Sequence, residues 1–122
     1  MNELKVINEQ EILGKQFRIY GDFDNPLFLA KDVAEWIEHS KASVMLNMVD
    51  EDEKLKETMF TSGQNREVWF LTENGVYEVL MKSDKPIAKD FKKAVKEVLK
   101  TIRKTGGYVA ENRAIDFVSM NL

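Results

Sequence analysis

The sequence predicts an α+β fold in which two β-hairpins form a small antiparallel sheet packed against four helices, the last helix long and basic. Three observations predict it. Residues 16–20 alternate polar and apolar side chains, a pattern typical of a half-buried strand. From Ala30 onward the apolar residues recur at helical spacing. The strands fall in pairs separated by turn residues, which favours hairpins over a parallel α/β sheet.

The first hairpin is predicted over residues 16–29. A strand over residues 16–20 is followed by a cluster of Gly, Asp, Asn and Pro over residues 21–26 and by a second strand over residues 27–29. Residues of these types favour turns because they tolerate or preset turn dihedral angles.

Two short helices should follow, over residues 31–38 and 43–49, with Ser43 as the N-cap of the second. Their spacing is similar to that of a helix-turn-helix. However, Glu38 stands near the position of the usual turn glycine, and only Ser43 and Asn47 could reach base edges. Four carboxylates at residues 50–53 would also repel a duplex. We therefore interpret these helices as core packing.

The second hairpin is predicted from strands over residues 56–60 and 67–71, with a turn over residues 61–66. Residues 68–71 are continuously apolar, so we expect that strand to be buried. The acidic residues 50–53 should face solvent. Thr72 can cap a helix of about ten residues.

The last helix should begin at Pro86, which suits the first helical position, and end at Gly106 and Gly107. Its apolar residues share one face: Ala88, Phe91, Val95, Val98, Leu99 and Ile102. At about 100° per residue, the cations lie opposite that face or along one flank of it. We name these cations the basic face: Lys89, Lys92, Lys93, Lys96, Lys100, Arg103 and Lys104.

The charges of the chain are unevenly distributed. The formal net charge is −3. Residues 1–61 carry 7 basic and 13 acidic groups, whereas residues 82–104 carry nine basic and three acidic groups. A local positive field can attract phosphate on an acidic protein, because salt screens distant charges. The basic face therefore predicts phosphate contacts, although a solvated amphipathic helix with cations near its C-terminus would show the same pattern.

Two further groups of residues are candidate anion sites. Lys85 lies at the start of the last helix, and Lys41 with Ser43 lies at a helix N-terminus, where backbone N–H groups favour anions. The sequence has no Cys and only one His, which excludes disulfides, thiol nucleophiles and His-based metal clusters. With no nucleophile elbow or Gly-rich phosphate loop, we expect no enzyme, no metal and no cofactor. No apolar run is long enough to span a membrane.

Five motifs, in order and at fitting separations, resemble the N-terminal domain of the BRO family. They are residues 28–34 (FLAKDVA), 49–54 (VDEDEK), 70–77 (FLTENGVY), 83–92 (SDKPIAKDFK) and 98–108 (VLKTIRKTGGY). The chain departs from the family pattern at residues 37–40, at Ala94, where Trp is common, and at Lys100, where Pro is common. Without that Pro, the last helix should run straight to its end.

The resemblance implies a DNA-binding regulatory role, as in the antirepressors of temperate phages, and localisation in the cytoplasm of a bacterial host cell. It also implies a domain over residues 1–108, followed by a tail or the start of a linker over residues 109–122. The expected partner is double-stranded DNA, and a regulator of this kind is expected to form homo-oligomers. The alternative is a protein-interaction module that inactivates a repressor by direct binding, since the acidic first half could engage a basic surface.

Overall fold

The computed structural model describes residues 4–61 and 63–104. The predicted end of the last helix at Gly106 and Gly107, and the predicted tail over residues 109–122, lie outside these residues. The strands are β1 (Val6–Ile12), β2 (Lys15–Gly21), β3 (Pro26–Leu29), β4 (Lys54–Thr61) and β5 (Gln64–Thr72). The helices are α1 (Ala30–Trp36), α2 (Ala42–Met45), α3 (Glu73–Lys82) and α4 (Pro86–Lys104), with short 3₁₀ turns at Leu46–Met48 and Glu51–Glu53.

The five strands form one antiparallel sheet in the order β1-β2-β3-β5-β4, so the predicted α+β fold is confirmed. Strand β1 was not predicted. Its inward positions are Asn8 and Gln10, both buried, and the Gln10 side-chain amide donates a hydrogen bond to Asn8 Oδ1 at 3.0 Å. Because the buried positions of this strand are polar, its sequence shows no apolar alternation.

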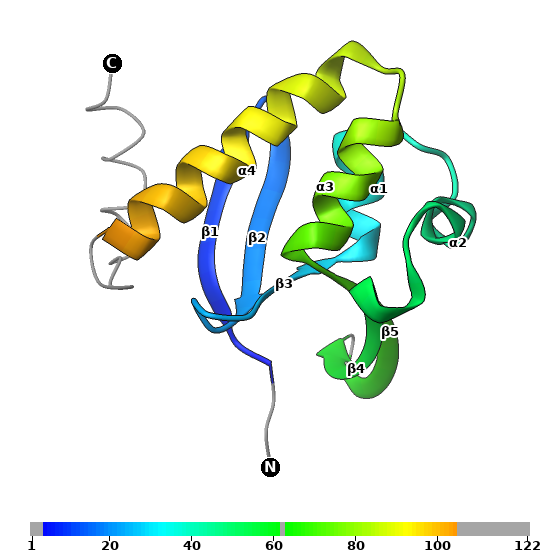
Figure 1. Cartoon of the computed structure of the whole chain (residues 1–122). Coiled ribbons are helices and arrows are strands. Elements are labelled where there is room, and N and C mark those ends of the chain that lie inside the picture. Colours follow the sequence, from blue (N-terminus) through cyan, green and yellow to red (C-terminus); the bar gives the residue numbers. More distant parts are fainter. Residues whose placement is uncertain (1–3, 62, 105–122) are drawn as a thin grey trace.

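The helices α3 and α4 lie side by side, and α4 crosses β1 and β2 (Figure 1). Trp36 of α1 joins the layers, because its ring stacks at 5.1 Å on both Phe17 of β2 and Phe91 of α4. Its indole N–H donates to the carbonyl of Gln16 at 2.8 Å. All six apolar residues predicted to share a face of the last helix are buried in this core.

A second, smaller apolar cluster lies apart from this core. It is centred on Tyr20, Leu29 and Phe70, from β2, β3 and β5, with Leu55, Met59 and Val68 packed around them. These side chains alternate along their strands with the core residues Ile19, Phe28 and Leu71, so they occupy the opposite face of the sheet.

The second hairpin differs from its prediction. Its strands extend to Thr61 and from Gln64, so the turn is much shorter than residues 61–66. Strand β5 pairs with β3 only through residues 70–72, and β4 pairs with β5 alone among the described strands. Residues 56–61 and 64–69 thus form a two-stranded projection, which we call the ribbon (Figure 1). Phe70 and Leu71 are buried as expected, but Trp69 in this ribbon is 36% exposed, so the expectation of burial over residues 68–71 holds only for its last two residues.

The structure confirms two of the three helix starts predicted from a capping residue or a proline. The Thr72 cap is confirmed, because the Gly75 N–H donates to Thr72 Oγ1 at 3.1 Å. Pro86 begins α4 as predicted. Ser43 is not an N-cap, since α2 begins at Ala42 and its cap residue Lys41 makes no side-chain capping bond. Of the acidic run, residues 50–52 are exposed, whereas Glu53 is half-buried and accepts a hydrogen bond from Thr72.

Candidate nucleic-acid interface

The helix α4 separates its apolar and charged residues cleanly. Its apolar side is buried against the sheet and α3, while six of the seven side chains of the basic face are exposed; the seventh, Lys92, is half-buried. The carboxylates Asp90 and Glu97 are also exposed, and at about 100° per residue they lie beyond the edge of the cationic arc.

One flank of the basic face contacts α3. Arg103 donates to Glu73 Oε1 at 3.0 Å and to the carbonyl of Phe23 at 3.3 Å. The hydrogen bond to Glu73 raises the pKa of Arg103 above its usual value. The Lys96 ammonium lies 5.9 Å from the ring centroid of Tyr77. Burial, and then the hydrogen bond from its hydroxyl to Glu73, raise the pKa of Tyr77 well above its usual range. Arg103 therefore helps to hold α3 against α4.

Four lysines of the basic face remain free: Lys89, Lys93, Lys100 and Lys104. All four are exposed, and none makes an ion pair or hydrogen bond with any residue that the structure describes. At 1.5 Å per residue they span about 22 Å of helix. An exposed ammonium without a carboxylate partner is available to neutralise a phosphate, so these four lysines form the strongest candidate anion surface.

The other candidate cations lie elsewhere. Lys85 precedes α4, and its ammonium donates to the carbonyl of Glu38 at 3.0 Å. Lys41 and Ser43 are both exposed, at the start of a helix of only four residues. So short a helix has little macrodipole, which weakens the physical basis for an anion site there.

The helices α1 and α2 do not form a helix-turn-helix with a recognition helix of ordinary length. Glu38 takes the left-handed conformation, with φ of +56°, at the turn position where glycine is usual. However, α2 has four residues, and Val44, which a helix-turn-helix would pack inward, is 48% exposed.

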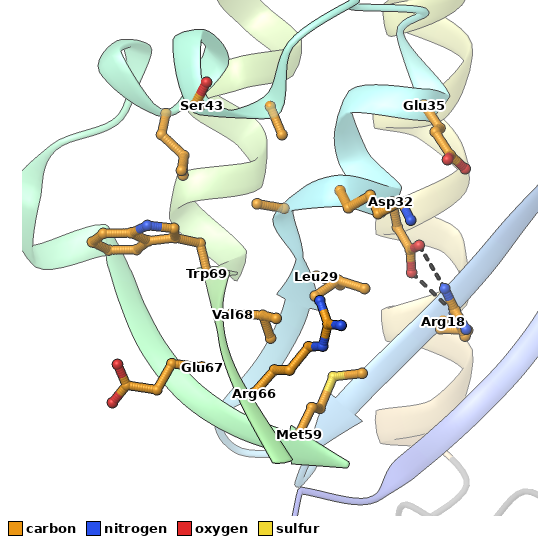
Figure 2. Close-up of a pocket in the computed structure, with 14 residues that line it drawn as sticks. Arg18, Leu29, Asp32, Glu35, Ser43, Met59, Arg66, Glu67, Val68 and Trp69 are labelled. Atoms are coloured by element: carbon orange, nitrogen blue, oxygen red, sulfur yellow. Dashed lines mark hydrogen bonds and ion pairs between the residues drawn. The ribbon is translucent and has the colours of Figure 1, made fainter. Parts of the chain in front are cut away.

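Sequence reasoning missed a hollow between α1, α2 and the ribbon, with a volume of about 670 Å³. Figure 2 shows the residues that line it, among them Ser43, Arg66 and Trp69. At one side Arg18 clamps the buried Asp32 with two hydrogen bonds of 2.7 and 3.0 Å. The lining residues come from six helices and strands and one 3₁₀ turn, so no local pattern in the sequence could have indicated the hollow.

Two kinds of feature are absent from residues 4–61 and 63–104. No helix there combines the length and apolar character needed to cross a membrane. Nor do three His, Asp or Glu side chains gather there closely enough to hold a metal ion.

Comparison with known proteins gives two matches. Residues 16–101 match the model of the family described as BRO family, N-terminal domain. A protein of Invertebrate iridescent virus 6, named for its Bro-N domain, is 28% identical over 118 aligned residues. The alignment covers 80% of this chain but only 28% of the viral protein. No solved structure gives a significant match.

Proposed function

The chain belongs to the BRO family, N-terminal domain, and from this membership we propose that it is the DNA-binding module of a phage or prophage regulator of the antirepressor type. Its role is to bind duplex DNA in the cytoplasm of the bacterial host, and not to catalyse a reaction. The contacts to phosphate come from α4.

The observation that carries this proposal is the row of free lysines on α4. Lys89, Lys93, Lys100 and Lys104 are exposed over about 22 Å and have no carboxylate partner among the described residues. Each phosphate that such a lysine neutralises releases a condensed counterion, which gives sequence-independent affinity. Arg103 contributes less because it would have to leave Glu73, and Lys92 contributes less because it is half-buried.

Fluorescence anisotropy of a labelled random-sequence duplex, titrated at several salt concentrations, tests the proposal. Four phosphate contacts predict a slope of log affinity against log salt of about −3.5. Contacts from the whole basic face would give a slope near −6. Absence of binding even at low salt would overturn the proposal.

Charge-reversal variants identify which lysines contact the DNA. The double variant Lys93→Glu/Lys100→Glu should weaken binding at least about tenfold on every sequence and make the salt slope shallower by about two. The matched control, Lys5→Glu/Lys31→Glu, makes the same change in net charge at exposed positions away from α4. If both double variants lose affinity equally, net charge and not α4 carries the binding.

A second candidate function is direct inactivation of a repressor. Two observations favour it: the excess of carboxylates in residues 1–61 and the exposure of residues 50–52 among them. Such a surface complements a basic DNA-binding domain. Capture of a repressor from the same genome should then be unaffected by Lys93→Glu/Lys100→Glu and abolished by neutralising residues 50–52. The opposite pattern would remove this candidate.

A further inference from the structure

We infer that the tip of the ribbon enters the major groove of duplex DNA and that Gln64 and Arg66 read base edges there. The inference rests on the proposed function, duplex binding, and not on which lysines of α4 provide it. A two-stranded antiparallel ribbon fits the major groove, which is about 12 Å wide. Strand pairs of this kind are an established means of reading DNA.

The ribbon is shaped for such insertion. Beyond the pairs of β5 with β3 at residues 70–72, residues 56–61 and 64–69 pair only with each other among the described strands. Gly63, with φ of +81°, lies in the tight turn at the tip and has open space around its Cα. Phe60 beside this turn is 61% exposed. A large aromatic side chain at the end of a projecting hairpin suits contact with another molecule.

The side chains at the tip are those that discriminate bases. Gln64 and Arg66 are exposed, and neither makes a hydrogen bond or ion pair with any described residue, although Arg66 also lies at the edge of the hollow beside α1. Being two residues apart, they lie on one face of the strand about 6.6 Å apart, close to the rise of two base pairs. Gln can pair bidentately with adenine and Arg with guanine. Asn65 between them points to the opposite face, beside Phe60.

The charges along the ribbon favour DNA at its tip. Residues 58–66 include Arg66 and no carboxylate. Glu57 and Glu67 flank this stretch, and the acidic residues 50–53 lie at the base of β4. From Lys54 to Thr61 the strand extends about 23 Å, more than twice the Debye length of about 8–10 Å. The acidic run therefore does not repel a duplex held at the tip.

Selection from a pool of duplexes with a randomised centre tests the inference. The wild-type chain should enrich a sequence motif. The variant Gln64→Ala/Arg66→Ala should bind unselected duplex within about threefold of wild type, yet lose about tenfold or more on the motif. The control Lys5→Ala/Asn65→Ala removes one cation and one amide, the amide from the other face of the tip, and should keep the preference.

Three outcomes of the binding experiments would overturn the inference. The first is an unchanged preference in Gln64→Ala/Arg66→Ala, and the second is wild-type binding to random duplex with no motif enriched; both leave the proposed function intact. The third is absence of any duplex binding, which would overturn the proposed function as well. Photo-cross-linking from p-benzoylphenylalanine placed at Phe60 provides an independent test. An adduct with DNA supports the inference, whereas an adduct between two copies of the chain contradicts it.

Discussion

Gly75 shows how one small residue allows α3 to approach the segment before β4. A Cβ added at this position would lie 2.6 Å from the carbonyl oxygen of Glu53, which belongs to the backbone and cannot simply rotate away. Gly75→Ala should therefore lower the free energy of unfolding by about 1–2 kcal/mol, because overpacking outweighs the gain in helix propensity of about 1 kcal/mol. Urea denaturation measures the loss. The neighbouring exposed Asn74→Ala, as control, should change stability by less than about 0.5 kcal/mol.

Arg18 and Asp32 form the most buried ion pair among the described residues. The Asp32 side chain is 3% exposed and the Arg18 side chain 30%, and the hydrogen bond to Asp32 raises the pKa of Arg18. Arg18→Met leaves a buried carboxylate without its partner, which should cost about 2–3 kcal/mol after allowance for solvent near Arg18. In a double-mutant cycle by urea denaturation, Arg18→Met/Asp32→Leu should recover most of that loss. A loss below about 0.5 kcal/mol in Arg18→Met would contradict this account.

Among the elements, the ribbon should be the least protected part of the sheet. Residues 56–61 and 64–69 have no third strand beside them, whereas β2 and β3 lie between neighbours and under the core. Beyond Met59 and Val68, which pack on the second cluster, the ribbon buries little apolar surface, so its amides should exchange by local and not global unfolding. Hydrogen exchange at neutral pH should be at least about tenfold faster in the ribbon than in β2. Equal protection in both would show that another contact holds the ribbon in place.

The elements that could be predicted from the sequence are those with a strong local signal. Pro86, the apolar spacing and the cations defined α4 and its exposed face, and Thr72 marked the start of α3. Strand β1 was not predicted because its buried residues, Asn8 and Gln10, are polar. The polar residues 64–66 gave the signal of a turn, but they form a strand because they pair with residues 59–61 of β4, where their own side chains stay exposed. The pairing of Arg103 with Glu73 joins residues thirty positions apart, so no local pattern could indicate it.

At the scale of the whole molecule, one core connects nearly every element. The buried cluster includes residues of β2, β3, β5, α1, α2, α3 and α4, and Trp36 stacks between the sheet and α4. The charged surfaces are consequences of this arrangement. Burial of the apolar side of α4 forces its lysines outward, and the pairing of β5 with β3 at residues 70–72 leaves the ribbon projecting. A change in the core should therefore affect both proposed DNA contacts together.

The two tryptophans provide a test of this cooperativity. Trp36 is fully buried, whereas Trp69 is 36% exposed in the ribbon. Trp69→Phe should change the free energy of unfolding by less than about 1 kcal/mol, since most of the side chain's apolar area can be retained. In that variant fluorescence reports Trp36 alone, and its urea transition should coincide with the transition in far-ultraviolet circular dichroism. An earlier fluorescence transition would mean that α4 separates from the sheet before the helices and strands unfold, and the single core would then not be one cooperative unit.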